Sequence, residues 1–443
     1  MLKQQLPLTL DDGLILRRAT EADAEQLIEA HSNLHRDAGV EEPDERVGAW
    51  VRDLMVRPHP TFDPGDFAVV EEPRNGHIVS SLCLISQTWS YGGIQFGVGR
   101  PELVATYPDY RQRGLIRALF DAVHEWSAER GDKMQCITGI PWYYRQFGYE
   151  MALNLGGGRA GYESHVPRLK EGEEETYRLR PAGEGDIPFL VEMDRRQRQR
   201  SLVGCVWDED LWRYELAGKS DNNVNRDLVR IVERDGDCVG MIMHPAALWG
   251  TMLPATTFEL RPGISWLAAG PAVIRYLWQT GQDMARAEGK EGLTTFGFWL
   301  GSEHPAYQAM ANRLPYVRKP YAWYIRVADL PDFIGRIAPF LEERLAASVA
   351  PGHTGELKLS FYRDGLRLIF EDGRIGAQPW KTIGEKGANA VFPGLTFLQL
   401  LFGYRSLEEL EGAMADCYAA GDEARVLLDA LFPKTPSDVR GVT

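Results

Sequence analysis

Cysteine, positive charge and long apolar runs are all scarce in this sequence of 443 residues, and each scarcity argues against a class of protein. The five cysteines are odd in number, widely spaced and without a Cys-x-x-Cys pair, which argues against a disulfide framework or a zinc site. The net charge of -14 argues against nucleic-acid binding, which normally needs a broad basic surface. No apolar run can span a bilayer, and the N-terminus lacks the apolar segment of a signal peptide. We therefore expect a cytoplasmic protein with no nucleic-acid partner and no membrane partner.

The histidines give no sign of a metal site. His31 and His35 are four residues apart and can meet on one face of a helix. No Cys, Asp or Glu completes a ligand set with them, so we predict no bound metal ion.

Residues 104–119 have the pattern of an anion-binding site. They read as an apolar strand, a turn rich in Arg and Gly, and an amphipathic helix. The free N–H groups and the positive dipole end of such a helix start bind anions, and Gly114 lets a ligand approach the backbone. Arg111, Arg113 and Arg117 add positive charge that pairs with phosphate. The segment predicts a site for a pyrophosphate-bearing cofactor, with a plain solvated helix start as the alternative.

A second segment, residues 137–150, favours the cofactor site over that alternative. It reads as a strand followed by an aromatic helical turn that contains Tyr-Arg-Gln-Phe-Gly-Tyr. Together the two segments resemble the signature motifs of the GNAT acyltransferases, in which the first motif binds the pyrophosphate of acetyl-CoA. Most GNAT proteins carry a small residue where this chain has Ile116, and Arg-x-Arg-Gly-Leu-Ile-Arg resembles the Eis subfamily of GNAT proteins.

The resemblance implies which residues form the site. Acetyl-CoA would contact a strand, the turn with the first turn of the helix, and the next strand, at Val104, Ala105, Thr106, Gln112, Arg113, Gly114, Leu115, Ile116, Arg117, Gly139 and Ile140. A β-bulge after Val104 would point a backbone N–H at the thioester carbonyl.

Tyr144 matches the general-acid tyrosine of the family. A phenol with a pKa of about 10 remains protonated at neutral pH and can reprotonate a thiolate with a pKa of about 8.5. We interpret Tyr143 and Tyr149 as packing aromatics. Four other aromatics are interpreted as core residues, with pocket walls as the alternative: Trp89, Tyr91, Trp142 and Trp323.

The general base is expected to be either the terminal carboxylate or a water relay. The resemblance to Eis proteins implies the carboxylate of the last residue, Thr443, although this ending differs from the aromatic ending of the family and terminal residues are commonly mobile. Asp37, Glu41 and Glu42 form a loop that can attract a cationic amine or can simply be solvated.

Two segments of the chain repeat one pattern. Residues 16–27 and 179–190 both begin with Leu-Arg, carry Ala at the fourth position and Asp at the eighth, and predict a strand that enters a helix, which Thr20 or Asp23 caps in the first copy. Residues 170–176 are charged and read as a linker. Residues 260–277 parallel the cofactor motif without its Arg-x-Arg-Gly turn, with Pro271 where a phosphate-facing N–H is wanted, and residues 304–316 parallel the Tyr144 turn. We predict a second GNAT-like fold that has lost its cofactor site, with an unrelated α/β domain as the alternative.

The last region begins near Leu330. Residues 355–373 alternate polar and apolar side chains, with a predicted hairpin turn at Asp364 and Gly365, and residues 392–403 and 407–410 read as helical. Strands followed by helices predict an α+β layer. The order resembles the sterol-carrier-protein-like domain that ends Eis-type chains.

The predicted fold class is α/β and α+β. Two tandem GNAT-like mixed-sheet domains are expected at residues 1–170 and 171–328, followed by an α+β sterol-carrier-protein-like domain at 329–443. The resemblance implies an acyltransferase that uses acetyl-CoA to acetylate primary amines of aminoglycosides, polyamines or lysine-like groups, by direct transfer in a ternary complex. It also implies a homo-oligomer, a hexamer. The alternative is a lipid- or CoA-binding carrier or scaffold without catalysis.

Overall fold

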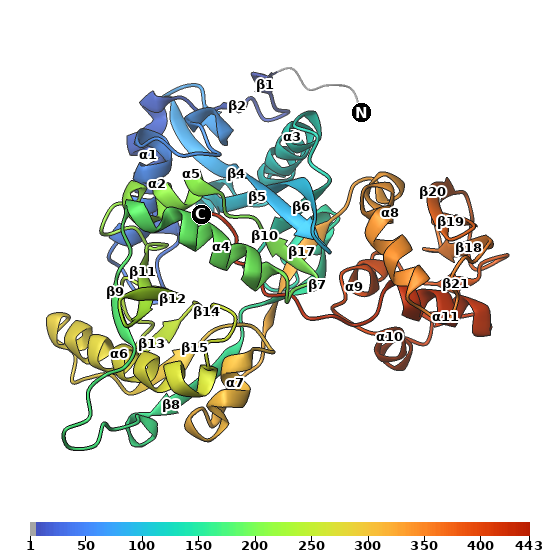
Figure 1. The fold of residues 1–443 in the computed structure, drawn as a ribbon. Helices are drawn as coiled ribbons and strands as arrows, with labels where there is room; N and C mark the ends of the chain where they lie inside the picture. The colour runs from blue at the N-terminus through green and yellow to red at the C-terminus, as the bar shows by residue number, and fades with distance from the viewer. Residues whose placement is uncertain (1–5) are drawn as a thin grey trace.

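The computed structural model describes residues 6–443 as three regions, and the end of the chain returns to the junction of the first two (Figure 1). No helix in the described part of the chain is long and apolar enough to cross a bilayer. The mixed α/β and α+β fold class predicted from the sequence is confirmed.

The first region is built on a mixed sheet whose strands run in the order β1-β2-β3-β4-β5-β6-β17-β7. Their bounds are β1 (Leu8–Thr9), β2 (Ile15–Arg18), β3 (Phe67–Glu72), β4 (His77–Tyr91), β5 (Ile94–Thr106), β6 (Met134–Ile137), β17 (Tyr321–Arg326) and β7 (Glu150–Leu155). The short strand β10 (Val203–Cys205) pairs with the far end of β4. The chain therefore contributes to this sheet from widely separated segments.

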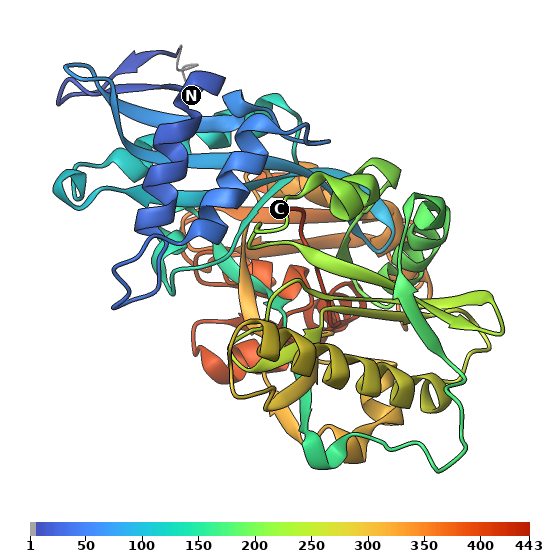
Figure 2. The same ribbon diagram turned by 90° about the vertical axis from the view of Figure 1, so that its left-hand side faces the viewer.

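Helices cover both faces of this sheet, and the alternation of side chains along each strand decides which helix meets which residue. Phe67 and Val69 of β3 pack in one core with α1 (Ala24–Leu34) and α2 (Glu45–Val56). Ala68 and Val70 point the other way and pack with α3 (Leu115–Glu129). Figure 2 shows α1 and α2 side by side across the strands.

The second region contains two four-stranded sheets and the long helix α6 (Trp266–Ala287). One sheet has the order β14-β12-β11-β9, with β14 (Thr257–Leu260), β12 (Asp237–Pro245), β11 (Asp227–Arg234) and β9 (Arg178–Pro181). The other has the order β13-β15-β8-β16, with β13 (Met252–Ala255), β15 (Thr295–Phe298), β8 (Gly158–Tyr162) and β16 (Tyr316–Arg318). The remaining helices are α4 (Ile187–Arg198), α5 (Glu209–Arg213) and α7 (Pro305–Ala309).

The first two regions exchange strands. β8 precedes the expected boundary at residue 170 yet pairs with β15 and β16 of the second region. β17 precedes the expected boundary at residue 328 yet lies between β6 and β7 in the first sheet. The boundaries predicted from the sequence did not include this exchange, because strand pairing between distant segments leaves no local pattern in either segment.

The repeated sequence pattern gives the same local structure twice. In the first copy, Arg17 forms a bidentate pair with Asp23 (2.8 and 2.8 Å) and also contacts Glu71. In the second copy, Arg180 forms a bidentate pair with Asp186 (2.7 and 2.9 Å) and also contacts Glu233. The aspartate also accepts a backbone N–H bond at the helix start in both copies, from Thr20 and from Gly183. This match supports an internal duplication.

The third region begins with a helix and not with the predicted strands. It contains α8 (Leu330–Ala346), β18 (Gly355–Ser360), β19 (Gly365–Glu371), β20 (Arg374–Trp380), β21 (Ala390–Val391), α9 (Phe397–Leu401), α10 (Leu407–Ala413), β22 (Tyr418–Ala419) and α11 (Asp422–Leu431). The hairpin predicted at Asp364 and Gly365 joins β18 to β19, but its loop runs from Phe361 to Asp364, because Gly365 already pairs with Ser360 in the sheet. The tight two-residue turn is at Asp372 and Gly373, whose φ angles of 48° and 82° suit a type I′ hairpin.

We expect β17 to be essential to the stability of the first region. Ile325 of β17 is completely buried, so Ile325→Ala should lower the free energy of unfolding by about 2–5 kcal/mol. Val317 of β16 is 59% exposed and is a matched control, for which the same change should cost less than about 0.5 kcal/mol. Denaturant unfolding measures both values, and equal losses would contradict the buried position of β17.

Candidate active site

A cavity of about 920 Å³ opens in the first region, beside the start of α3. Its walls come from the end of α1, from β5, from the turn before α3, from the segment after β6 and from the helical turn η4 (Tyr143–Phe147). Every residue that the sequence analysis assigned to the cofactor lines this cavity except Arg113, and Tyr144 lines it as well.

The cavity exists because β5 and β6 separate. The two parallel strands pair only at Val98 with Met134 and at Gly99 with Gln135. Further along β5, Leu103 and Val104 together stand opposite one residue of β4, which is a β-bulge, and Leu103 has a φ of 52°. The bulge predicted after Val104 lies at Leu103 and Val104, where the positive φ occurs. The bulge leaves this edge of β5 facing the cavity.

The turn before α3 presents backbone donors to the cavity. Gly114 is the N-cap of α3 with a φ of 75°, and Gln112 is also left-handed with a φ of 62°. Leu115, Ile116 and Arg117 occupy the first turn of the helix, and their N–H groups donate to no other described residue. A Cβ built on Gly114 meets nothing within 4 Å, so the backbone at this point is open. This arrangement suits an anion.

The three arginines of the turn differ in direction. Arg111 and Arg117 line the cavity. Arg113 instead donates to the carbonyl of Asp109 at 2.9 Å and lies over the ring of Tyr110. The side chain of Arg113 therefore points away from the position expected for the cofactor.

Tyr144 lies at the inner wall of the cavity. Its side chain is nearly buried, and a Cβ built on Gly139 would be 3.6 Å from its hydroxyl oxygen. Burial, and next the negative charge of Glu102, raises the pKa of Tyr144 above the ordinary value. The phenol is thus protonated at neutral pH and can donate a proton.

Tyr144 is surrounded by aromatic rings. Tyr149 is fully buried and its hydroxyl lies 2.8 Å from Nε2 of His124, as expected for a packing residue. Tyr143, also predicted to be a packing residue, is only partly buried and lines the cavity. Tyr324 of β17 contacts the Tyr144 ring at 5.4 Å between centroids. The Tyr324 hydroxyl also accepts a hydrogen bond from the backbone N–H of Trp142. A residue from the second half of the chain thereby fixes the turn that carries Tyr144.

Glu102 is a cavity residue that the sequence analysis did not identify. It is the only carboxylate among the described residues that line the cavity. Arg100 binds it with Nε at 2.8 Å and Nη2 at 2.5 Å from the same carboxylate oxygen. The two residues are two apart on β5 and therefore share one face of the sheet, which was the available signal in the sequence.

The other predicted polar residues have clear positions. His31 and His35 do meet, with 3.3 Å between their Nδ1 atoms, and burial lowers the pKa of His35, which lines the cavity. No group of three His, Cys, Asp or Glu side chains suited to a metal ion occurs among residues 6–443. The acidic loop residues are exposed and do not line the cavity: Asp37, Glu41 and Glu42. Three of the four other aromatics are buried in the core as predicted: Trp89, Tyr91 and Trp323. The core position predicted for Trp142 is wrong, because this side chain is 68% exposed.

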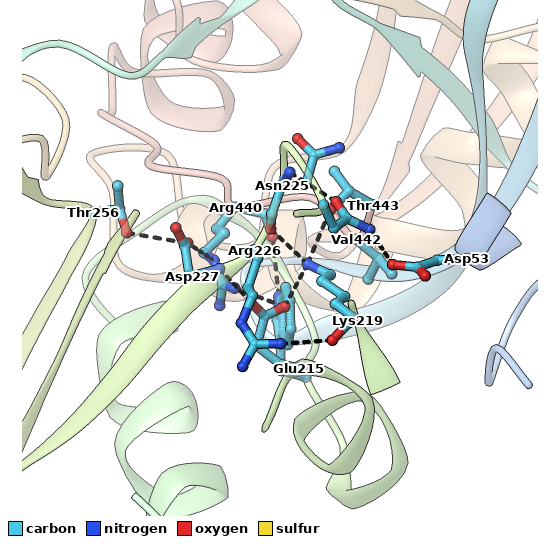
Figure 3. Close-up of polar contacts among 12 residues, drawn as sticks. Asp53, Glu215, Lys219, Asn225, Arg226, Asp227, Thr256, Arg440, Val442 and Thr443 are labelled. Atoms are coloured by element: carbon cyan, nitrogen blue, oxygen red, sulfur yellow. Dashed lines mark hydrogen bonds and ion pairs between the residues drawn. The ribbon is translucent and has the colours of Figure 1, made fainter. Parts of the chain in front are cut away.

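Thr443 lies outside the set of residues that line the cavity. Its hydroxyl accepts a hydrogen bond from Nζ of Lys219 at 3.2 Å (Figure 3). The carbonyl of the preceding residue, Val442, accepts hydrogen bonds from Arg100 and Gln87 of the first sheet. The end of the chain is therefore held in place.

The second region carries aromatic side chains at the start of α6, the place that the sequence pattern aligns with the start of α3. Trp266, the first residue of α6, packs against Phe258 at 4.8 Å and against His304 at 5.1 Å between ring centroids. Pro271 lies in the second turn of α6 and not at its start, so it does not replace a phosphate-facing N–H as predicted. Aromatic packing, and not the proline, therefore distinguishes the start of α6 from the start of α3.

Comparison with known proteins places these observations in a family context. Residues 16–152 match the model of the GNAT acetyltransferase domain. The match identifies the chain as an acyltransferase. The matched segment contains the bulge, the turn at Gly114 and Tyr144. Among curated proteins, none matches the sequence.

Solved structures show the same fold over nearly the whole chain. A probable N-acyltransferase of Enterococcus faecalis shares 15% identity with a TM-score of 0.65, over 97% of this chain and 100% of that one. A GCN5-related N-acetyltransferase of Kribbella flavida shares 18% identity with a TM-score of 0.62, over 96% and 97%. Eis1 of Mycobacterium abscessus shares 12% identity with a TM-score of 0.59, over 96% and 99%. The three-region architecture thus recurs in these proteins.

The raised pKa of Tyr144 can be measured. A difference titration between the wild type and Tyr144→Phe, followed by tyrosinate absorbance, should show no ionisation of this phenol at the ordinary value of about 10, because burial and the Glu102 charge both disfavour the anion. An amide of free tyrosine in the same buffers is the reference. A transition at the reference pH would contradict the environment described for Tyr144.

Proposed function

We propose that the chain is an N-acetyltransferase that transfers the acetyl group of acetyl-CoA to the primary amine of a small molecule. The acceptor class is an aminoglycoside, a polyamine or a lysine-like group, and the transfer takes place directly in a ternary complex. The observation that carries the proposal is the convergence of three features on one cavity: the open amides at the start of α3, the Tyr144 phenol and the Glu102 carboxylate.

The turn and the bulge would bind acetyl-CoA. The N–H groups of Leu115, Ile116 and Arg117, together with the side chains of Arg111 and Arg117, suit a pyrophosphate in charge and direction. The open edge of β5 from Val104 to Thr106 can pair with the amides of the pantetheine arm. The backbone N–H at the bulge can polarise the thioester carbonyl.

Acetyl transfer then needs three proton movements. The acceptor nitrogen forms a bond to the thioester carbon, and the bond from that carbon to sulfur breaks. The acceptor ammonium first loses one proton to the base, which frees the nitrogen lone pair for attack. The leaving thiolate gains a proton from the Tyr144 hydroxyl, and the second proton of the nitrogen restores that hydroxyl. No cysteine is among the described residues that line the cavity, which supports direct transfer over a cysteine-linked acyl-enzyme.

We propose Glu102 as the base that takes the proton from the amine, directly or through a water. Two carboxylates are candidates, Glu102 and the chain end at Thr443, and only Glu102 lines the cavity. A carboxylate at this place also attracts a cationic amine to the acetyl group. The base role of Thr443 stays a prediction that the geometry supports less well.

The wider likeness to Eis1 adds proposals about the rest of the molecule. The third region would be a sterol-carrier-protein-like domain, and the chain would form a homo-oligomer, a hexamer, in the cytoplasm. The domain boundaries near residues 170 and 328 would divide the chain in sequence order. In space, β8 pairs in the second region and β17 pairs in the first. The alternative of a carrier without catalysis is decided by the activity test below.

Gly114→Ala should weaken binding of coenzyme A by about tenfold or more, because a methyl group would project into the open cradle and the left-handed backbone disfavours it. Gly131→Ala is the matched control, since Gly131 ends the same helix with a φ of 77° and also has open space around it. Both variants should lose about 1–2 kcal/mol of stability, but only the first should lose affinity in calorimetry. Equal affinity in the two variants would place the nucleotide elsewhere.

Glu102→Gln and Tyr144→Phe should each lower kcat by about 100-fold to 10,000-fold on an amine panel, with coenzyme A binding unchanged. Glu41→Gln, in the exposed acidic loop, should leave kcat unchanged. If the wild type acetylates no amine but binds fatty acid, the carrier function replaces this proposal. If it acetylates amines and Glu102→Gln is fully active, Glu102 is not the base.

A further inference from the structure

The last residues of the chain are buried between the first two regions. After α11, the chain leaves the third region and ends beside the first sheet, as the position of the C-terminus shows (Figure 1). Ser437, Val439 and Val442 are at most 5% exposed. A terminal segment that is buried over several residues has a defined path and can transmit a constraint.

Arg440 anchors this segment to the second region. Its guanidinium lies over the ring of Trp207 at 3.9 Å and pairs with Glu215 at 3.2 Å and Asp227 at 3.6 Å (Figure 3). The Trp207 indole N–H donates to the carbonyl of Arg440 at 3.0 Å. Glu215 is in turn paired with Lys219 at 2.8 Å, and both side chains are buried. The anchor is therefore a buried network with several partners.

The next residues contact the wall of the active site. The Val442 carbonyl accepts from Nη1 of Arg100 at 2.7 Å and from Nε2 of Gln87 at 2.9 Å. The other two nitrogens of the same guanidinium, Nε and Nη2, hold the Glu102 carboxylate. Arg100 is 7% exposed, so water cannot readily replace a partner that its guanidinium loses. One planar group thus joins the end of the chain to the carboxylate in the cavity.

We infer that the C-terminal segment positions the catalytic carboxylate of Glu102 through Arg100. Arg100 and Val442 are positioning residues, and the terminal carboxylate of Thr443 is not required for proton transfer. This inference rests on the proposed function of Glu102 as the base. It gives the second region a part in catalysis, because that region anchors the segment through Arg440.

The physical reason is the fixed geometry of the guanidinium. Without the Val442 carbonyl, Nη1 of Arg100 would be buried with one partner fewer, and the group would rotate to find another. Because the same group carries both bonds to Glu102, the carboxylate would move with it. A displacement of about 1 Å in a catalytic group can cost about 100-fold in rate.

Gly441 offers a specific way to test this. A Cβ built on Gly441 would be 2.9 Å from Nη1 of Arg100 and 3.3 Å from both Oε1 of Gln87 and the Trp323 ring. The closest atom is the far end of a flexible side chain, so Gly441→Ala displaces the guanidinium most, while Gln87 and the Trp323 ring must shift by a few tenths of an ångström. Gly412→Ala is the matched control, because a Cβ there meets nothing within 4 Å.

The experiment is a double-mutant cycle between Gly441→Ala and Glu102→Gln in the full-length protein, with Gly412→Ala as control. We expect Gly441→Ala to lower kcat by about 100-fold while the Kd for coenzyme A stays within twofold. In the Glu102→Gln background the same change should have less than a twofold effect, because the group it acts through is gone. The deficit of Gly441→Ala should also shrink as the pH approaches the pKa of the acceptor amine, since the amine then arrives deprotonated.

Two results would overturn the inference. If Gly441→Ala lowers kcat by the same factor in both backgrounds, the chain end acts independently of Glu102, as a terminal carboxylate base would. If Gly441→Ala is as active as Gly412→Ala, the contact has no effect on catalysis. Arg100→Lys is a second variant, for the case in which Gly441→Ala does not fold, because it adds no atom to the core. It should reproduce the loss of kcat while coenzyme A binding is retained. A wild type without acetyl transfer would instead refute the proposed function itself.

Discussion

The insertion of β17 between β6 and β7 is the constraint on which the catalytic region depends. β17 pairs along one edge with Tyr324 to Arg326 against β6 and along the other with β7. Without it, both neighbours would have unpaired backbone groups inside the sheet, which is costly for a buried edge. The same strand carries Tyr324, whose ring contacts Tyr144 and whose hydroxyl accepts a hydrogen bond from the backbone N–H of Trp142. The acid of the proposed mechanism is therefore positioned by a part of the chain almost two hundred residues away.

The separation of β5 from β6 creates a second requirement, because it leaves backbone donors without partners. In the first region these donors face a cavity, and a ligand can satisfy them. In the second region the rings of Trp266, Phe258 and His304 pack together at the start of α6, the place that the sequence pattern aligns with the start of α3. Under the proposed function, a ligand would satisfy the donors in the first region, whereas aromatic side chains pack at the matching helix start in the second. The turn at Gly114 and the aromatic side chains would decide which of the two occurs.

Local features of the site could be predicted from the sequence, because a few adjacent residues determine them. The turn at Gly114, the helix after it and the tyrosine turn all follow from short patterns, and so does the Arg-Asp pair of each copy. Glu102 could not be separated from other strand residues, since its role depends on a cavity formed by distant segments. The course of the C-terminus was equally hidden, because its contacts with Arg100 join residues more than three hundred positions apart. Both Asp-Gly pairs lie at hairpins, but strand register, which the sequence does not state, decides that Asp364 ends a longer loop while Asp372 and Gly373 form a two-residue turn.

The second region is tied to the cavity of the first region by strands and by side-chain contacts. The second region supplies β17 to the first sheet, receives β8 in return, and holds Arg440 at the end of the chain. One apolar core also runs through all three regions and includes Val69, Ile231 and Leu357. Removing the second region would therefore expose apolar surface and unpaired strand edges in the first region as well. Since Tyr324 contacts Tyr144 and the Val442 carbonyl binds Arg100, the partner of Glu102, selection for the proposed catalysis would also act on segments outside the first region.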